Sequence, residues 1–278
     1  MSSATLSLGD VLRRASEHLD KTSETGRLDA ELLLAHTLGR HRIELYTDFD
    51  RPLSSHELDT YRDLVGRRAR HEPVAYILGE WGFRRLTLTV DRRALIPRPE
   101  TEIVVERALT HLRALEQPAV LDVGTGTGAI ALAIADEHPG AKVTAIDVSS
   151  DAIALARENA ARTGLAVELL HHDLLAGLPG GPYELVVSNP PYVEPVDLET
   201  LMPDVRDYEP HAALVGTGAT EAIARGATSV LSPGGHLVLE VGDGQAATTS
   251  ALLDGLGYAG VLTTPDLAGR GRVVEGRR

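Results

Sequence analysis

The stretch Ser188-Asn189-Pro190-Pro191-Tyr192 gathers groups that could hold a flat amide or amine. It follows the apolar segment 183–187, a pattern that indicates a buried strand, and two prolines cannot continue a sheet because neither has a backbone N–H. Asn189 offers both an acceptor and a donor, the Pro190 carbonyl is held in a set direction, and Tyr192 adds a flat aromatic face. These groups suit a planar ligand with an NH2 group, whereas a plain strand-ending turn is the alternative interpretation.

A second candidate site is the run Asp122-Val123-Gly124-Thr125-Gly126-Thr127-Gly128, which joins an expected strand to an expected helix. Its glycines allow a tight turn and let a ligand lie against backbone N–H groups at the helix N-terminus. The spacing of Gly124, Gly126 and Ala129 also satisfies the dinucleotide pattern G-x-G-x-x-G/A. Taken alone, this turn therefore leaves an NAD-dependent oxidoreductase open.

Three aspartates, each at the expected C-terminal end of a strand, favour S-adenosylmethionine over NAD. Asp122 would repel an anionic pyrophosphate but attract a sulfonium and an ammonium group. Asp147 is placed to accept both ribose hydroxyls, and Asp173, which is followed by Leu174, could accept from an adenine amino group. Each aspartate alone is explained by a cap or a turn, so only the three together favour S-adenosylmethionine. No metal is expected, because the chain has no cysteine and its N-terminal histidines lack metal-ligand spacing.

The elements that must position these residues follow from the hydrophobic pattern. Residues 1–75 predict a small helical bundle, residues 76–96 a β-hairpin connector, and residues 97–278 an α/β domain that begins with a helix at about 101–115. Alternating strands and helices in that domain predict a doubly wound, mostly parallel sheet of seven strands. The expected strands are 119–123, 142–148, 167–170, 183–187, 236–241, 260–264 and 272–275, and the expected helices between them are 129–137, 150–163, 219–231 and 245–256.

Composition excludes some classes of function. The net charge is −13, whereas a protein that grips nucleic acid through its phosphates is normally basic. The N-terminus lacks the basic-then-apolar layout of a signal peptide, and the apolar runs are far shorter than the ~20 residues of a membrane span. The absence of cysteine agrees with a reducing compartment. A cytoplasmic protein without a membrane segment is the expectation.

Taken together, these motifs resemble the peptide chain release factor glutamine methyltransferase family, which has the Rossmann-like fold of class I methyltransferases. The resemblance covers essentially the whole chain, including the order of helical domain, hairpin and methyltransferase fold. The Asn-Pro-Pro-Tyr run alone is less specific, since DNA adenine and other N-methyltransferases share it. Three further stretches narrow the resemblance to this family: 96–102 (Ile-Pro-Arg-Pro-Glu-Thr-Glu), 205–210 (Val-Arg-Asp-Tyr-Glu-Pro) and 266–272 (Asp-Leu-Ala-Gly-Arg-Gly-Arg).

The resemblance implies methyl transfer from S-adenosylmethionine to the side-chain N5 of the glutamine in the Gly-Gly-Gln motif of bacterial release factors, with S-adenosylhomocysteine as product. It further implies that residues 1–75 recognise the partner, and a monomer is expected. Some relatives carry an aromatic residue where Leu174 stands, so aromatic packing on adenine is not carried over to this position. The cofactor would be met by Gly124, Thr125, Gly126, Thr127, Gly128, Asp147, Asp173, Leu174 and Asn189, and the substrate glutamine by Asn189, Pro190, Pro191 and Tyr192.

The expected chemistry is positioning without a general base, because no side chain usefully deprotonates an amide near neutral pH. Asn189 and the Pro190 carbonyl would accept the two amide N–H bonds, and Tyr192 would pack on the amide plane. Four alternatives remain at this point. They are a glutamine methyltransferase acting on a ribosomal protein, an adenine-N6 nucleic-acid methyltransferase, an NAD-dependent oxidoreductase, which Asp122 opposes, and a non-catalytic binding module that keeps the fold.

Overall fold

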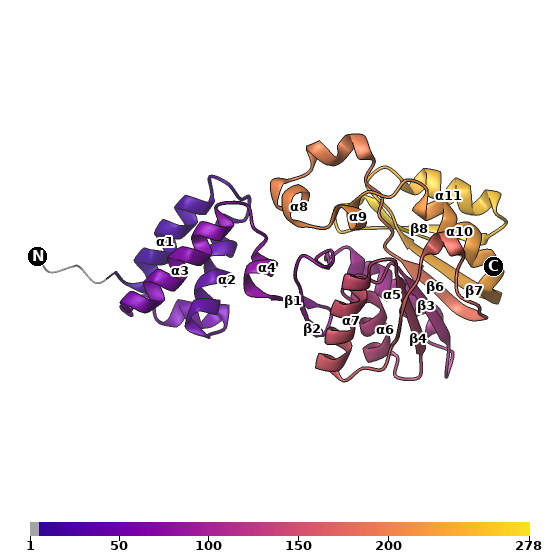
Figure 1. The fold of residues 1–278 in the computed structure, drawn as a ribbon, viewed down its shortest axis with the longest axis horizontal. Coiled ribbons are helices and arrows are strands. Elements are labelled where there is room, and N and C mark those ends of the chain that lie inside the picture. The colour runs from indigo at the N-terminus through magenta and orange to yellow at the C-terminus, as the bar shows by residue number, and fades with distance from the viewer. Residues whose placement is uncertain (1–5) are drawn as a thin grey trace, which may run out of the picture. The chain divides into compact units, whose positions relative to one another are not determined.

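The computed structural model describes residues 6–278, which form two compact units (Figure 1). One unit contains the described residues up to Gly79 together with Met202–Tyr208. The other contains Glu80–Leu201 and Glu209–Arg278. Within residues 6–278, no helix has both the length and the apolar character needed to cross a bilayer.

The larger unit is built on a seven-stranded sheet with the order β5-β4-β3-β6-β7-β9-β8. The strands from β5 to β7 are parallel, and β9 runs antiparallel to both β7 and β8. The prediction of a mostly parallel sheet of seven strands is therefore confirmed. The strands are β3 (Ala119–Val123), β4 (Lys142–Asp147), β5 (Glu168–His171), β6 (Tyr183–Ser188), β7 (Leu231–Glu240), β8 (Ala259–Pro265) and β9 (Gly271–Arg277).

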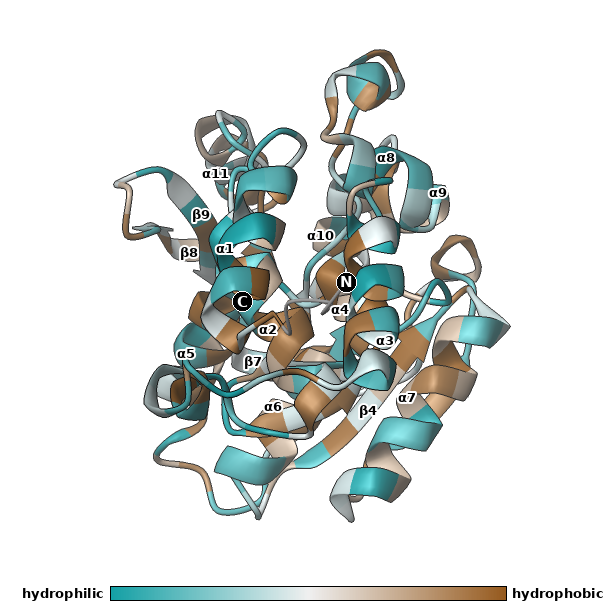
Figure 2. Cartoon of the chain, turned by 90° about the vertical axis from the view of Figure 1, so that its left-hand side faces the viewer, coloured by the Kyte–Doolittle hydropathy of each residue, from teal (hydrophilic) through white to brown (hydrophobic). Residues whose placement is uncertain are grey.

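Both faces of this sheet are covered, which explains why its central strands are almost continuously apolar. Val120 and Val187 belong to a core that includes residues of α5, α6 and α7, whereas Leu121 and Val186 belong to a second core with α10 and α11. Figure 2 shows hydrophobic and hydrophilic residues alternating along α7, as a helix packed on one side requires. The helices are α5 (Thr101–Leu112), α6 (Ala129–Glu137), α7 (Ser150–Thr163), α9 (His211–Leu214), α10 (Ala219–Val230) and α11 (Ala246–Gly255), with short 3-10 helices η2 (Leu174–Ala176) and η3 (Pro195–Thr200).

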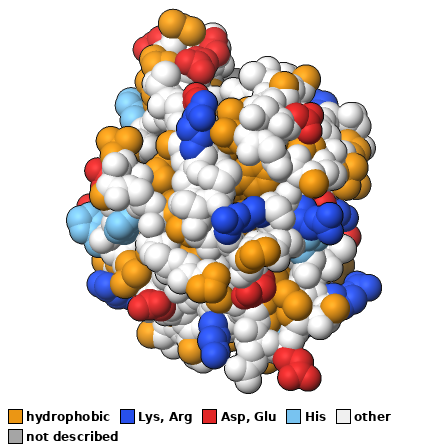
Figure 3. Space-filling view, turned by 90° about the vertical axis from the view of Figure 1, so that its right-hand side faces the viewer, with side chains coloured by type: hydrophobic (Ala, Val, Ile, Leu, Met, Phe, Trp, Pro, Cys, Tyr) orange, Lys and Arg blue, Asp and Glu red, His pale blue; other side chains and the backbone are white. Residues whose placement is uncertain are grey.

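The surface of the molecule carries charges of both signs. On the face drawn in Figure 3, basic and acidic side chains are interspersed among uncharged and hydrophobic ones. This mixture is typical of a solvated surface.

The predicted β-hairpin is present but shorter than expected. Strands β1 (Glu80–Phe83) and β2 (Leu86–Thr89) pair antiparallel. Phe83 packs in the core with α5 and α6. Residues 76–78, predicted as part of the hairpin, lie instead in the single-turn helix α4 (Val74–Leu78), because Gly79 follows in the left-handed conformation that ends a helix.

The smaller unit is a bundle of helices, as predicted. Ser7 caps the first helix by accepting from the Asp10 amide at 3.2 Å. A Ser54–Glu57 capping box opens the third helix, and Gly39, with a φ of 60°, ends the second. The helices are α1 (Leu8–Leu19), α2 (Gly26–Leu38), η1 (Arg42–Thr47), α3 (Ser55–Arg68) and α4.

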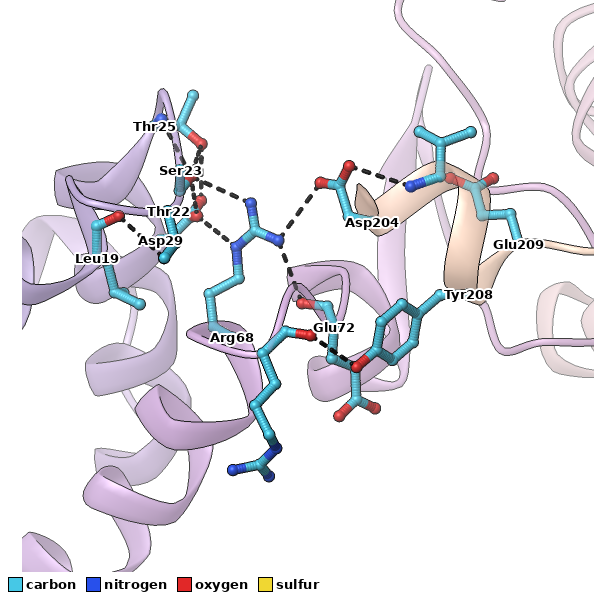
Figure 4. Close-up of polar contacts among 12 residues, drawn as sticks. Leu19, Thr22, Ser23, Thr25, Asp29, Arg68, Glu72, Asp204, Tyr208 and Glu209 are labelled. Carbon is cyan, nitrogen blue, oxygen red and sulfur yellow. Dashed lines mark hydrogen bonds and ion pairs between the residues drawn. The ribbon is translucent and has the colours of Figure 1, made fainter. Parts of the chain in front are cut away.

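A buried arginine ties the distant segment α8 (Pro203–Tyr208) to this bundle (Figure 4). The Arg68 guanidinium donates to Asp29 Oδ2 at 2.7 Å and to Asp204 Oδ2 at 3.3 Å. The Tyr208 hydroxyl donates to a backbone carbonyl just after α3 at 2.8 Å. The hydrophobic pattern of the sequence did not indicate that a segment more than 130 positions away in the chain would join the bundle.

Candidate active site

A cavity of about 360 Å³ lies in the larger unit at the carboxyl ends of its parallel strands. This is the edge at which open α/β sheets bind ligands. The turns that follow four neighbouring strands, β3 to β6, contribute to its wall. Most of the lining residues fall in the ranges 93–98, 123–127, 146–149, 172–175, 188–191 and 210–223, and the lining also includes Thr101, Ala129, Ile130 and Ala152.

The glycine-rich turn after β3 holds a shape that only glycine adopts readily. Gly124, Gly126 and Gly128 have φ values of 74°, 55° and 84°. A Cβ added at Gly124 would meet no heavy atom within 4 Å, so this backbone faces open space in the cavity wall. Gly124 and Thr125 both donate to one β4 carbonyl, at 2.9 and 3.0 Å. Gly126 N donates to Asp147 Oδ2 at 2.9 Å and Gly128 N to a carbonyl of the turn at 2.8 Å.

These four amides are thus committed to bonds inside the protein, which differs from the expectation that the turn offers its N–H groups to a ligand. The turn instead presents a close, side-chain-free backbone surface. Thr127 also lines the cavity, and its carbonyl accepts from Asn159 Nδ2 at 3.0 Å. Gly128 does not line the cavity: it precedes α6, where a Cβ would lie 3.1 Å from Leu132 Cδ1.

Asp122 lies behind the turn and not in the cavity wall. Strand alternation turns its side chain to the same face as Val120, and it is fully buried there. Its Oδ2 accepts from Thr125 Oγ1 at 2.6 Å, whereas Oδ1 has no hydrogen-bond partner among the described residues. Burial raises the pKa of Asp122 to about 7, with the Thr125 hydrogen bond opposing the rise and the charge of Asp147 adding to it. Its influence on a ligand is therefore electrostatic and sensitive to pH.

Two further aspartates do line the cavity. Asp147 Oδ1 accepts from Ser149 N at 2.9 Å, and its Oδ2 accepts from Gly126 N. Burial raises the pKa of Asp147, although these backbone hydrogen bonds oppose the rise. Asp173 Oδ1 accepts from Leu175 N at 2.8 Å and so caps η2, and Leu174 beside it also faces the cavity. Carboxylate oxygens that accept one bond each retain a lone pair for a hydroxyl or amine of a ligand.

Asn189 stands where β6 ends and continues the side of the sheet used by Val187. It lines the cavity together with Pro190 and Pro191. Asn189 Nδ2 donates to Thr101 Oγ1 at 3.3 Å, so the side-chain oxygen is directed away from Thr101. A Cβ added at Gly216 would lie 2.6 Å from the Pro191 backbone oxygen, which shows how closely another loop packs behind this turn.

Tyr192 does not line the cavity. Its ring lies next to Gly242, where an added Cβ would be 3.0 Å from Tyr192 Cδ2, and its carbonyl accepts from Gln245 Nε2 at 3.0 Å. Burial raises the pKa of Tyr192. Packing of this ring on a substrate amide stays a prediction, whereas its contacts in the structure hold the end of the loop.

Comparison with known proteins assigns the chain to a protein family. Residues 10–79 match the model of the PrmC N-terminal domain, and residues 102–203 match that of the methyltransferase small domain. A release factor glutamine methyltransferase of Geobacter sulfurreducens is 44% identical over 262 residues, which covers 93% of this chain and 92% of that protein. One from Deinococcus radiodurans is 41% identical over 278 residues, covering 98% and 99%. The chain belongs to the release factor glutamine methyltransferase family.

The fold of the larger unit also recurs among solved methyltransferases. The T. thermophilus 16S rRNA N2 G1207 methyltransferase, in complex with AdoMet and guanosine, has a TM-score of 0.53 with this chain. The match covers 72% of this chain and 49% of that one at 18% identity. At that identity the likeness concerns the fold alone, which is the class I methyltransferase fold expected from the sequence.

The cavity of this family member has features that suit S-adenosylmethionine. The open space in front of Gly124 admits a ligand close to the backbone. The carboxylates of Asp147 and Asp173 can accept from hydroxyl and amino groups, and apolar residues such as Ile96 and Leu174 line the same space. Asp122 behind the turn adds negative charge near a cation when it is ionised.

The stretch 96–102, which carries part of the family resemblance, contributes both to the cavity wall and to contacts outside it. Ile96, Arg98 and Thr101 line the cavity, whereas Glu102 accepts from the Arg84 amide at 3.0 Å. The buried Glu209 holds the corner in place, since it accepts from Ile96 N at 3.2 Å and pairs with Arg98.

One buried pair next to the site was not predicted from the sequence. Thr101 Oγ1 donates to Glu240 Oε2 at 2.7 Å, and both residues are buried. A glutamate that ends an apolar strand was the available signal, because a buried carboxylate at that edge of the sheet requires a partner. Burial raises the pKa of Glu240 to about 7, and the Thr101 hydrogen bond opposes the rise.

Proposed function

We propose that this protein transfers a methyl group from S-adenosylmethionine to the side-chain N5 of the glutamine in the Gly-Gly-Gln motif of bacterial release factors. The supporting observation is the extent of the match to named release factor glutamine methyltransferases, at 44% identity across 93% of the chain. The cavity edge formed by Asn189, Pro190 and Pro191 is suited to an amide and supports the same assignment.

The cofactor half of the cavity is assigned to the first three turns. When bound, S-adenosylmethionine supplies a methyl group on a sulfonium, which is strongly electrophilic. Asp147 accepts the ribose hydroxyls, and Asp173 with Leu174 meets the adenine. The backbone of Gly124 to Gly126 lies against the amino-acid part, with the charge of Asp122 behind it.

The substrate half is assigned to the turn after β6. Asn189 Oδ1 and the Pro190 carbonyl accept the two N–H bonds of the glutamine amide, which aims the nitrogen at the methyl group and favours the positive charge that develops on it. Because the methylated amide is a strong acid, its extra proton is lost to water and no side chain has to act as a base. Much of the rate then comes from proximity and orientation.

The partner is a protein loop, and residues 1–75, which form helices in the part that the structure describes, are assigned to its recognition. The net charge of −13 favours a protein partner over a nucleic acid. We further propose that the enzyme acts in the cytoplasm as a monomer and without a metal. The described residues contain no group of three or more histidines or acids arranged to hold a metal ion.

Radiolabelled S-adenosylmethionine and purified release factor test this function directly. One sample contains the intact Gly-Gly-Gln motif, and the other contains the motif with its glutamine changed to alanine. Label on the intact protein alone supports the proposal. Label on both samples would show that the methyl group is attached to another residue. Label on neither, with cofactor binding confirmed by calorimetry, would make a ribosomal protein the next substrate to test.

A further inference from the structure

The amide of Asn189 has to be held in one of two orientations. A substrate N–H needs an acceptor, so the side-chain oxygen must face the cavity and the NH2 group must face the protein. The two orientations have nearly the same shape, and only hydrogen-bond partners distinguish them. The inference below rests on the proposed function, because that function requires the oxygen to face the substrate.

We infer that Glu240, acting through Thr101, is a positioning residue that orients Asn189 for methyl transfer. Three elements meet here: β7 ends at Glu240, α5 begins at Thr101, and Asn189 follows β6. Since Ser188 pairs with Leu239 in the parallel register, Asn189 and Glu240 are the next residues on neighbouring strands.

The direction of the two hydrogen bonds follows from the number of protons available. An ionised Glu240 carboxylate can only accept, so the single hydroxyl proton of Thr101 must be donated to it, at 2.7 Å. Thr101 Oγ1 then has only lone pairs left to offer. It is the NH2 group of Asn189 that must face it, at 3.3 Å, and the carbonyl oxygen is directed to the other side.

Protonation of Glu240 removes this constraint. A carboxylic acid at that position can donate to Thr101 Oγ1, which frees the hydroxyl proton to be donated to an Asn189 oxygen turned the wrong way. The charged and titratable groups that face Glu240 are Arg98 and Glu100 before α5, Tyr192 after β6 and Arg272 on β9. The arginines favour the carboxylate and Glu100 disfavours it, while burial is the largest effect and brings the pKa to about 7.

Glu240→Gln tests the inference, since glutamine is isosteric but can donate as well as accept. We expect kcat to fall about 10- to 100-fold, because a misdirected Asn189 leaves a substrate N–H without an acceptor. The dissociation constant for S-adenosylmethionine should not change. Thr101→Val should lose a similar factor, and Thr101→Ser, which keeps the hydroxyl, should restore most of the rate.

The pH profile separates positioning from a structural effect. The wild-type kcat should rise with pH around 7, and this step should disappear in Glu240→Gln. Burial raises the pKa of Asp122 into the same range. The step in kcat is therefore assigned to Glu240 only if it is absent in Glu240→Gln. Glu275→Gln is the matched control: this buried carboxylate on β9 accepts from Arg107 at 2.8 Å outside the cavity, so its variant should lose stability but keep the step.

A second readout does not depend on turnover. The side-chain 15N–1H2 signals of Asn189, identified by their absence in Asn189→Asp, should shift with a midpoint near pH 7 in the wild type and not in Glu240→Gln. Unchanged kcat in Glu240→Gln, or a titration of these signals that persists in it, would overturn the inference. If the wild type shows the titration but methylates no release factor, the proposed function fails while the positioning of Asn189 stands.

Discussion

Gly216 supports the substrate loop from behind, and replacing it by alanine is a test of how precisely that loop must be held. The residue does not have a positive φ, so its backbone conformation is one that alanine adopts without strain. Space is the only obstacle. The added Cβ would lie 2.6 Å from the Pro191 backbone oxygen and 2.7 Å from its Cβ.

The size of the effect follows from these distances. A comfortable carbon contact is about 3.5 Å, so the two loops must separate by roughly 1 Å. Neither atom of Pro191 belongs to a flexible chain end, and Pro190 and Asn189 move with it. A displacement of about 1 Å at reacting groups costs on the order of 100-fold in rate. We expect Gly216→Ala to lower kcat by that order while S-adenosylmethionine still binds.

The assay combines single-turnover methylation of release factor with calorimetry of cofactor binding and a thermal melt. Gly255→Ala is the matched control, because a Cβ there meets nothing within 4 Å and its φ is not positive. That variant should keep wild-type activity. If Gly216→Ala remains folded and retains kcat within about twofold of the wild type, the loop tolerates the shift and the reasoning from close packing is refuted.

Three further outcomes follow from the site. Asn189→Ala should abolish methyl transfer and leave cofactor affinity nearly unchanged, and loss of both in calorimetry would count against its role toward the amide. Asp147→Asn should weaken S-adenosylmethionine binding by about 10-fold, because one acceptor for the ribose hydroxyls is lost; an unchanged dissociation constant would contradict that assignment. Asp122→Asn should stabilise the fold at pH 8 by up to ~4 kcal/mol relative to wild type. The pKa of Asp122 is raised from 3.8 to about 7 in the folded state, so its destabilising effect is absent below pH 3.8 and fully developed above 7. Denaturant melts that show the same gain at pH 4 and pH 8 would refute this.

Most of the larger unit could be predicted from the sequence because its signals are local. The strands from β3 to β6 are short apolar runs, each followed by a turn or a cap, and the structure has them within two residues of the expected bounds. Because these signals are local, the prediction that residues 76–78 belong to the hairpin was wrong. Three apolar residues suit a strand or a helical turn equally, and Gly79 decides for the helix through its left-handed φ of 75°.

Contacts between distant segments could not be predicted from these local signals. The segment Met202–Tyr208 is short and polar, and its place in the helical unit depends on one buried arginine that meets Asp204. Nor does periodicity reveal that Tyr192 turns toward Gly242 and away from the cavity.

The pair of Thr101 and Glu240 lies between these two cases. Parallel register, once β6 and β7 are known to be neighbours, places Glu240 beside Asn189 from the sequence alone. The sequence does not reveal the hydrogen-bond partner of this carboxylate, Thr101, which lies at the start of a helix 139 positions earlier. A buried acid at the active edge of a sheet must find a donor there. The residues that orient a catalytic amide are therefore found by asking which donor pairs with each buried carboxylate near it. The sequence motif that contains the amide does not reveal them.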